Sequence, residues 1–260
     1  MSGRAYTEAF RGASHRAVLD RGGLLVSVSF YVIIVGTLTG LWRVAVGANH
    51  GLLGGYSAVA LTWYIVTSEA AIVAVTARLI EDIGHDIAHG TIAVELLRPV
   101  SVLGQRVASE TGRALPKVAC LWLAGGVLAS VVAGGPPRPS TLLLAAPSLV
   151  LAVVANVLGQ HAAAAVAFWL RDAGSAWFLY LKAVFIAGGM IIPLELLPHG
   201  LEVASRLLPF RAMAYAPARL AAGYAEPGLL VEQIGWIVVL AAVARAAFAA
   251  GERRLQVVGG

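Results

Sequence analysis

Residues 24–46 read LLVSVSFYVIIVGTLTGLWRVAV, and this stretch decides the fold class of the chain. Arg43 is its single charged residue, whereas a helix that crosses a bilayer needs about 20 consecutive, mostly apolar residues. Similar stretches recur along the 260 residues, 59% of which are hydrophobic and 13% charged. Soluble domains carry about 25% charged residues. The composition therefore predicts an all-α, polytopic integral membrane protein.

Six membrane-spanning helices are predicted, with both termini on one side. They cover residues 24–46, 52–76, 114–133, 141–170, 175–192 and 229–250. Twelve of the 19 Lys and Arg residues then lie on the side of the termini and five on the other, while Lys182 and Arg245 lie within spans. The excess of positive charge places both termini in the cytoplasm. The whole chain, 1–260, is interpreted as one transmembrane domain.

Residues 4–20 predict an amphipathic helix before the first span. Tyr6, Phe10 and Ala13 are spaced to share one face of a helix, whereas Arg4 falls on the opposite face. We expect this helix to lie on the inner leaflet, with its arginines near anionic headgroups. The alternative is an ordinary positively charged flank with no lateral helix.

A charged segment, residues 77–113, separates the second and third apolar runs. Its apolar stripe consists of Ile80, Ile83 and Ile87, and polar side chains face the other way. Gly90 weakens helix propensity and Pro99 interrupts a helix. The pattern predicts a short helix, a break, a second short element and a stop. Such a segment is too small for a catalytic domain but large enough for a docking surface.

The connection 193–228 is apolar enough to stay at the membrane, yet it is repeatedly interrupted. The interrupting residues are Pro193, Pro198, Pro209, Pro217, Gly223 and Pro227. Two short half-helices, about 201–208 and 212–222, that dip back from the outer face would explain this pattern. Broken helices of this kind are tolerated where protein covers their free backbone groups. We therefore predict a re-entrant external hairpin before the last span.

These features together resemble the permease subunit of ABC exporters of the second type, the ABC-2 family, in particular its small six-helix branch. The resemblance covers nearly the whole chain. It is carried by the lead-in helix, by Asp86-Ile87, Gly90 and Leu96-Leu97-Arg98-Pro99 in the loop, and by Gly188-Gly189-Met190-Ile191-Ile192-Pro193-Leu194-Glu195-Leu196-Leu197-Pro198 in the hairpin.

The resemblance implies that the 77–113 loop carries a coupling helix, which contacts a separate ATP-hydrolysing subunit. The residues implied at or near this contact are Glu81, Asp82, Asp86, His89, Gly90 and Arg98, with Arg171 and Asp172 in a shorter inner turn. It also implies two permease subunits, identical or homologous, that bear two ATPase subunits. Gly36 and Gly40 form a small-xxx-small pair. The resemblance places this pair, with Gly188 and Gly189, at the contact between permeases.

The sequence contains no loop that would cradle a nucleotide phosphate. Such a loop needs several glycines followed by Lys and Ser or Thr, and no such string occurs. We therefore expect no cofactor in this chain, with ATP and Mg bound by the partner ATPase. Neither a rhomboid-type serine motif nor an aspartate cluster supports an enzyme, and no metal-ligand spacing accompanies His161. The net charge of +5 reflects membrane topology rather than nucleic-acid binding.

Polar and aromatic side chains inside the predicted spans mark a candidate substrate path. An acidic side chain near the bilayer centre costs about 2.5–3.5 kcal/mol, so Glu69 should face protein or water, unless it lies near a span boundary. It would bind a cationic substrate or pair with a neighbouring subunit. The other candidates are Trp63, Tyr64, Asn156 and Gln160. For Asn156 and Gln160 the alternative is interhelical hydrogen bonding.

The expected function is ATP-driven export of a hydrophobic or amphiphilic compound, such as a drug, an antibiotic or a lipid, across the bacterial cytoplasmic membrane. The direction of transport comes from the resemblance alone. Two alternatives remain at this point. One is a non-transporting membrane protein for immunity or sensing, and the other is an ion-coupled carrier that uses Glu69.

Overall fold

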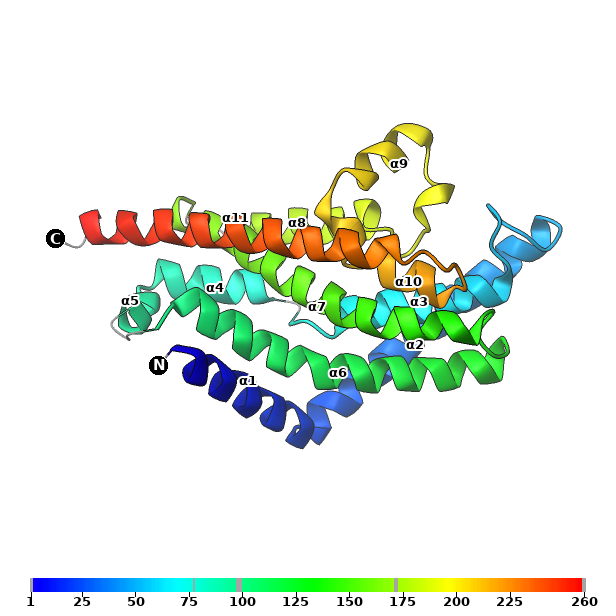
Figure 1. Cartoon of the computed structure of the whole chain (residues 1–260), viewed down its shortest axis with the longest axis horizontal. Helices are drawn as coiled ribbons and strands as arrows, with labels where there is room; N and C mark the ends of the chain where they lie inside the picture. Colours follow the sequence, from blue (N-terminus) through cyan, green and yellow to red (C-terminus); the bar gives the residue numbers. More distant parts are fainter. Residues whose placement is uncertain (1, 77, 97–99, 171–172, 259–260) are drawn as a thin grey trace.

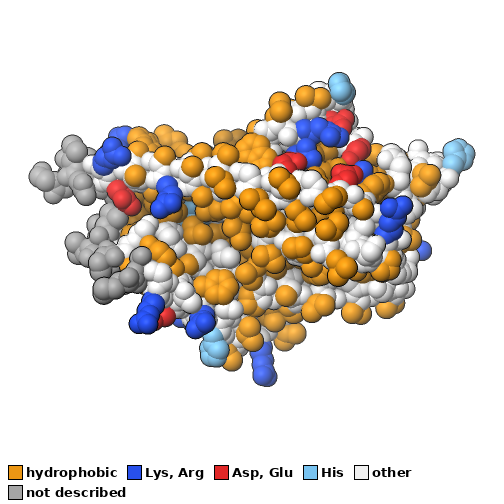
Figure 2. Space-filling model, viewed as in Figure 1, with side chains coloured by type: hydrophobic (Ala, Val, Ile, Leu, Met, Phe, Trp, Pro, Cys, Tyr) orange, Lys and Arg blue, Asp and Glu red, His pale blue; other side chains and the backbone are white. Residues whose placement is uncertain are grey.

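The computed structural model describes residues 2–76, 78–96, 100–170 and 173–258, and every regular element in these ranges is a helix. The predicted all-α class is therefore confirmed. The helices form an elongated bundle in which both termini lie at one end, together with the short helices α4 and α5 (Figure 1). Apolar side chains cover much of the face seen in Figure 2, and charged side chains gather near the end that holds the termini and around the hairpin that contains α9.

Within the described ranges, four segments are long and apolar enough to cross a bilayer. They are α2 (Arg21–Ala48), α6 (Val102–Val132), the segment Pro139–Phe168, and the part Gly228–Arg254 of α11 (Gly228–Val258). The segment Pro139–Phe168 consists of the 3₁₀ turn η1 (Pro139–Thr141), the helix α7 (Leu142–Ala164) and the 3₁₀ turn η2 (Ala165–Phe168). Two shorter apolar helices accompany them, α3 (Ala58–Val73) and α8 (Gly174–Ala187). The chain is thus a polytopic membrane protein, while a count of six spans remains a prediction.

The helix α3 begins six residues later than the predicted start of the second span at position 52. Leu53 and Tyr56 exchange two backbone hydrogen bonds of 3.0 Å across a turn whose two central glycines have positive φ. Ser57 then caps the helix, because its side chain accepts a hydrogen bond from the backbone N–H of Ala60. The apolar residues before Ser57 belong to a tight turn, which hydropathy alone does not distinguish from a helix.

The helix α6 begins at Val102, so residues 102–113 extend the third predicted span rather than belonging to the loop. With 31 residues, α6 is about 46 Å long, whereas the hydrocarbon core of a bilayer is about 30 Å thick. The extension is covered by α1 (Ser2–Leu19): a Cβ atom added to Gly104 would lie 3.0 Å from the Tyr6 ring, and Gly112 lies against the backbone of Phe10. The apolar face of α1 therefore packs on α6, and its position on the inner leaflet stays a prediction.

The segment 193–228 folds into η3 (Leu194–Leu196), α9 (His199–Arg206), η4 (Pro209–Ala212) and α10 (Tyr215–Ala221). Of these, α10 is buried and packs against α3 and α7, whereas α9 projects from the side of the bundle (Figure 1). The preceding helix, α8, ends at Ala187 rather than at the predicted position 192. It stops there because Gly189 takes a φ of +65°, which turns the chain.

The loop after α3 contains α4 (Leu79–Ala88) and α5 (Thr91–Leu96), separated by Gly90 with a φ of +73°. This is the predicted order of helix, break and second element. The buried face of α4 contains the predicted stripe, Ile80, Ile83 and Ile87. It packs on α7, η2 and α8, because an amphipathic helix of ten residues is stable only when its apolar face is covered.

Candidate functional site

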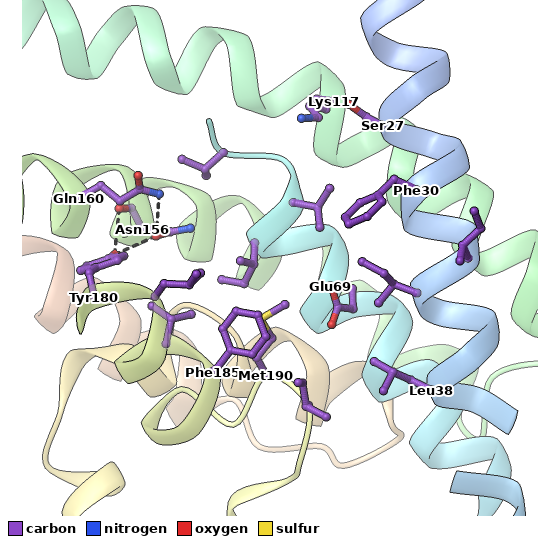
Figure 3. A pocket seen from close by; sticks show the side chains of 18 of the residues that line it. Ser27, Phe30, Leu38, Glu69, Lys117, Asn156, Gln160, Tyr180, Phe185 and Met190 are labelled. Atoms are coloured by element: carbon purple, nitrogen blue, oxygen red, sulfur yellow. Dashed lines mark hydrogen bonds between the residues drawn. The ribbon is translucent and has the colours of Figure 1, made fainter. Parts of the chain in front are cut away.

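A cavity of about 670 Å³ lies among α2, α3, α7 and α8 (Figure 3). Its walls are mostly apolar, and they include Phe30, Ile33, Ile72, Leu181, Phe185 and Met190. A few polar side chains interrupt these walls, including Ser27, Glu69, Lys117, Asn156 and Gln160. A mostly apolar cavity with a small number of polar groups is the usual form of a site for a small organic ligand.

Glu69 reaches the cavity from the middle of α3, with 1% of its surface exposed. Its Oε2 atom has no hydrogen-bond partner among the described residues, and no ion pair to its carboxyl is found there. A buried polar atom without a partner is costly. Glu69 therefore offers an acceptor to whatever enters the cavity.

Asn156 and Gln160 lie one turn apart on α7 and also line the cavity. The Gln160 Nε2 atom donates to Asn156 Oδ1 at 3.4 Å, and the Tyr180 hydroxyl on α8 donates to the same oxygen at 2.8 Å. This cluster links α7 to α8, as the alternative of interhelical hydrogen bonding predicted. In the described part of the chain, Gln160 Oε1 has no partner, so the cluster also presents an acceptor near the cavity.

Trp63 and Tyr64 do not line this cavity, so their place on a substrate path stays a prediction. The Trp63 Nε1 atom donates to the carbonyl of Gly134 at 3.3 Å, and the Tyr64 hydroxyl donates to the carbonyl of Gly189. Ser68 on the same helix donates to the carbonyl of Met190 at 2.8 Å. Tyr64 and Ser68 hold α3 to the chain that follows α8, and Trp63 holds it to the turn that follows α6, because helical rotation turns all three away from the face that carries Glu69.

The helices α4 and α5 form a second candidate site at the end that holds the termini. Asp82, His89 and Gly90 are exposed there, and the rings of His85 and His89 stack at 3.9 Å. Val94 on α5 is 65% exposed and was not singled out in the sequence, because one valine beside a helix break carries no distinctive pattern. This exposed face of α4 and α5, centred on Asp82, His89, Gly90 and Val94, is called the α4–α5 surface below.

Asp86 and Glu81 are less available than the sequence predicted. Asp86 forms an ion pair of 2.6 Å with Arg106 of α6, and Arg106 also pairs with Glu95 of α5 at 2.8 Å. Glu81 pairs with Arg78, three residues earlier, at 3.2 Å. Arg106 thus ties α4 and α5 to α6, and the carboxylate of Asp86 serves this internal contact.

Three predicted coupling residues, Arg98, Arg171 and Asp172, lie outside the described residues. The neighbouring Ala173 packs against Gly84 of α4 so closely that a side chain on that glycine would collide with its Cβ atom. The two inner connections, which lie far apart in the sequence, therefore meet beside α4.

The four glycines predicted at a permease contact have two different environments. Gly36 and Gly40 are exposed on α2, and a Cβ atom added to either would meet open space. Gly188 and Gly189 are buried inside the subunit against Val184, Phe210 and Leu194. The latter pair serves packing within the chain, which corrects its predicted place at the contact between permeases.

A polar cluster missed by the sequence reading closes the opposite end. The Glu195 carboxylate accepts hydrogen bonds from the hydroxyls of Tyr56, at 3.1 Å, and of Tyr215. Arg219 lies 3.4 Å from Glu195 and 3.1 Å from Glu226. We call these five residues the outer clamp. Acidic and basic residues scattered over the apolar segment 193–228 were the available signal, but their pairing depends on how this segment folds back.

The comparisons with known proteins agree with this architecture. A family model described as ABC-2 family transporter protein matches residues 32–259, which is most of the chain. No curated protein matches the chain. Membership of this family implies partnership with an ABC ATPase subunit. The chain belongs to the ABC-2 family of transporters, as the membrane-embedded permease of an ABC transporter.

Proposed function

We propose that this chain is the permease of an ATP-driven exporter in the bacterial cytoplasmic membrane, with both termini in the cytoplasm. The cargo is a hydrophobic or amphiphilic compound of the kind moved in multidrug efflux, and ATP is bound with Mg and hydrolysed by two copies of a separate ATPase. One observation supports this proposal above the others. The α4–α5 surface is anchored to α6 and α7, and both of these helices contribute side chains to the cavity.

The anchoring explains how an ATPase would move the spans. The salt bridges from Arg106 and the packing of Ile80 and Ile83 leave α4 little freedom relative to α6 and α7. Packed helices shift as rigid bodies rather than deforming continuously. Displacement of the α4–α5 surface when ATP closes the partner would therefore tilt the cavity-lining helices. The outer clamp is the contact that must open for release on the far side.

Transport across the permease needs two subunits in this proposal. The exposed faces of α2 and α8, which flank the cavity, carry large apolar side chains such as Phe30, Ile33, Phe178 and Leu179. A second permease, identical or homologous, would cover this side of the cavity. Membrane lipids cover the remaining outer faces.

The experiment co-expresses the chain with a candidate ABC ATPase and compares Val94→Arg with Leu201→Arg. Val94 is 65% exposed on the α4–α5 surface, and Leu201 is 49% exposed on α9 in the hairpin. We expect Val94→Arg to abolish copurification of the ATPase and ATP-dependent accumulation of a lipophilic dye in inside-out vesicles. Leu201→Arg should preserve both.

Two results would contradict the proposal. Unchanged copurification and transport in Val94→Arg would remove the α4–α5 surface as the coupling site. Dye transport that follows a proton gradient without ATP, and that is lost in Glu69→Gln, would favour an ion-coupled carrier instead.

A further inference from the structure

The main cavity continues into a second, smaller one. A polar cavity of about 340 Å³ lies among α1, α2 and α6, and it shares Ser27 and Lys117 with the main cavity. Lys117 and Ser27 lie together where α2 passes α6 (Figure 3). The two cavities therefore meet at one lysine, with a mostly apolar space on one side and a polar space on the other.

The smaller cavity is rich in positive charge. Arg16, Arg113 and Lys117 line it, and Asp20 contributes the one carboxylate. Asp20 is occupied by capping α2, because its side chain accepts a hydrogen bond from the backbone N–H of Gly23 at 3.0 Å. Arg113 pairs with Glu110 at 3.0 Å. In the ranges that the structure covers, Arg16 and Lys117 form no ion pair. The cavity is thus suited to an anionic group.

The position of these cations matches the boundary between headgroups and acyl chains. If the last 20 residues of α6 cross the hydrocarbon core, as the length of a span requires, Arg113 lies at its edge. Lys117 then lies about 6 Å deeper, one helical turn further along. A half-buried lysine at this depth carries its charge toward the polar boundary by extending its side chain.

The main cavity has the length of an acyl chain in one leaflet. Along α2 it is lined from Val26 to Leu38, a distance of about 18 Å at the rise of an α-helix. One leaflet contributes about 15 Å of hydrocarbon. The lining is mostly aliphatic and aromatic, so an apolar tail that enters beside Ser27 would remain covered over its whole length.

We propose that the two cavities together bind an anionic amphiphile, with its acidic head between Arg16, Arg113 and Lys117 and its apolar tail along α2. The acidic group is a phosphate or a similar anion on an apolar chain, taken from the leaflet on the side of the termini. The inference rests on the proposed function in treating the cavity as the substrate route, and it names the charge of the substrate. Lipid binding is measured on the permease without an ATPase, so this inference and the proposed export function can fail separately.

The test titrates the purified permease with three probes and counts bound molecules by native mass spectrometry. Phosphatidylglycerol supplies an anionic head with tails, phosphatidylcholine a zwitterionic head with tails, and glycerol phosphate the anionic head alone. We expect phosphatidylglycerol to bind at least about tenfold more tightly than either of the others, which is the effect of one charge-assisted hydrogen bond.

Two sets of variants separate head from tail. Lys117→Gln and Arg16→Gln should each weaken phosphatidylglycerol binding by about tenfold, whereas Lys182→Gln should not, because Lys182 lies against the Phe178 ring outside both cavities. Leu181→Trp fills the tail cavity and should also weaken binding. Val238→Trp, at an exposed position of α11 outside both cavities, should leave it unchanged.

Several results would overturn the proposal. Equal binding of phosphatidylglycerol and phosphatidylcholine would show that the cations do not select the head. Binding of glycerol phosphate as tight as that of the lipid, with no effect of Leu181→Trp, would leave a site for a free anion only. An equal loss in Lys182→Gln would indicate nonspecific attraction. Size-exclusion profiles establish that each variant is folded, and Arg16→Gln, at an exposed position of α1, keeps the test available if Lys117→Gln does not fold.

Discussion

Glu69 and Glu110 are both buried glutamates, yet their surroundings differ. Glu69 is 1% exposed and its Oε2 atom has no partner among the described residues, whereas Glu110 is 3% exposed and fully engaged. The Glu110 carboxylate accepts hydrogen bonds from the backbone and hydroxyl of Thr76 and pairs with Arg113. The carboxylate of Glu69 therefore destabilises the fold, whereas the contacts of Glu110 stabilise it.

Replacing each glutamate by glutamine should therefore have opposite effects. Glu69→Gln should raise the free energy of unfolding, because it removes a buried acidic group without a partner, and Glu110→Gln should lower it, by about 1–3 kcal/mol in each case. Thermal unfolding of the purified permease measures both. A decrease in both variants would show that Glu69 has a partner in the native membrane.

Tyr56 and Tyr215 make the outer clamp sensitive to alkaline pH, whereas their hydroxyls do not titrate near neutral pH. Burial raises the pKa of both hydroxyls above the ordinary value of about 10, and the neighbouring Glu195 raises it further. Because these pKa values are higher in the folded state, the protonated hydroxyls stabilise the fold below about pH 10. This stabilisation is lost as the pH rises above that value. Both hydroxyls therefore keep donating to Glu195 throughout the physiological range.

We expect the rate of proteolysis in α9 to stay constant from about pH 6 to pH 9 and to rise above about pH 10. The double variant Tyr56→Phe and Tyr215→Phe lacks the titrating hydroxyls, so its rate should already be raised at neutral pH and should change less in alkali. An increase between pH 6 and pH 8 would point to another titrating group and contradict this account.

At the scale of elements, Arg106 of α6 connects that helix to both α4 and α5. Arg106→Gln leaves the carboxylates of Asp86 and Glu95 close together without their shared cation. Amide hydrogen exchange in residues 79–96 should rise on the order of tenfold, and ATP hydrolysis should become uncoupled from transport while the ATPase still copurifies. Arg78→Gln is the matched control, because Arg78 is exposed and pairs within its own segment.

The outer clamp is a second connection between elements, and Arg219 is at its centre. Arg219→Gln removes the cation that faces Glu195 and Glu226 and lies over the Tyr224 ring at 3.3 Å. Loss of a partly buried ion pair should cost about 2–4 kcal/mol and should raise the passive leak of small solutes through vesicles. Arg206→Gln should change neither, since Arg206 pairs with Glu202 on the exposed helix α9. Equal effects of the two substitutions would refute a specific clamp.

The sequence predicted those elements whose pattern is local. The isoleucine stripe of α4, the break at Gly90 and the two short helices of the hairpin follow from periodicity and from glycine and proline positions. The start of α3 and the extension of α6 did not follow, because a turn made of apolar residues resembles a helix and a polar extension resembles a loop. The outer clamp depends on contacts between residues far apart in the chain, such as Tyr56 and Arg219, which no local pattern encodes.

At the scale of the whole molecule, the exposed face of α2 remains without a partner in the single chain. Gly36 and Gly40 lie on this face in open space, while the neighbouring residues Ile34 and Leu38 line the cavity. Small residues spaced four apart allow two membrane helices to approach closely. A second permease on this face would complete the wall of the cavity, so assembly and substrate binding are linked in this arrangement.

Cysteine cross-linking tests this contact. In a Cys120→Ala background, which removes the one native cysteine, Gly40→Cys should form a disulfide-linked dimer on mild oxidation in membranes, because a bond requires Cα atoms within about 7 Å. Gly235→Cys on α11 is the matched control, since Gly235 also faces open space but lies on a helix away from the cavity. A dimer with Gly235→Cys and none with Gly40→Cys would place the partner on α11. The cavity beside α2 would then open toward lipid, and the permease would take its cargo from the side.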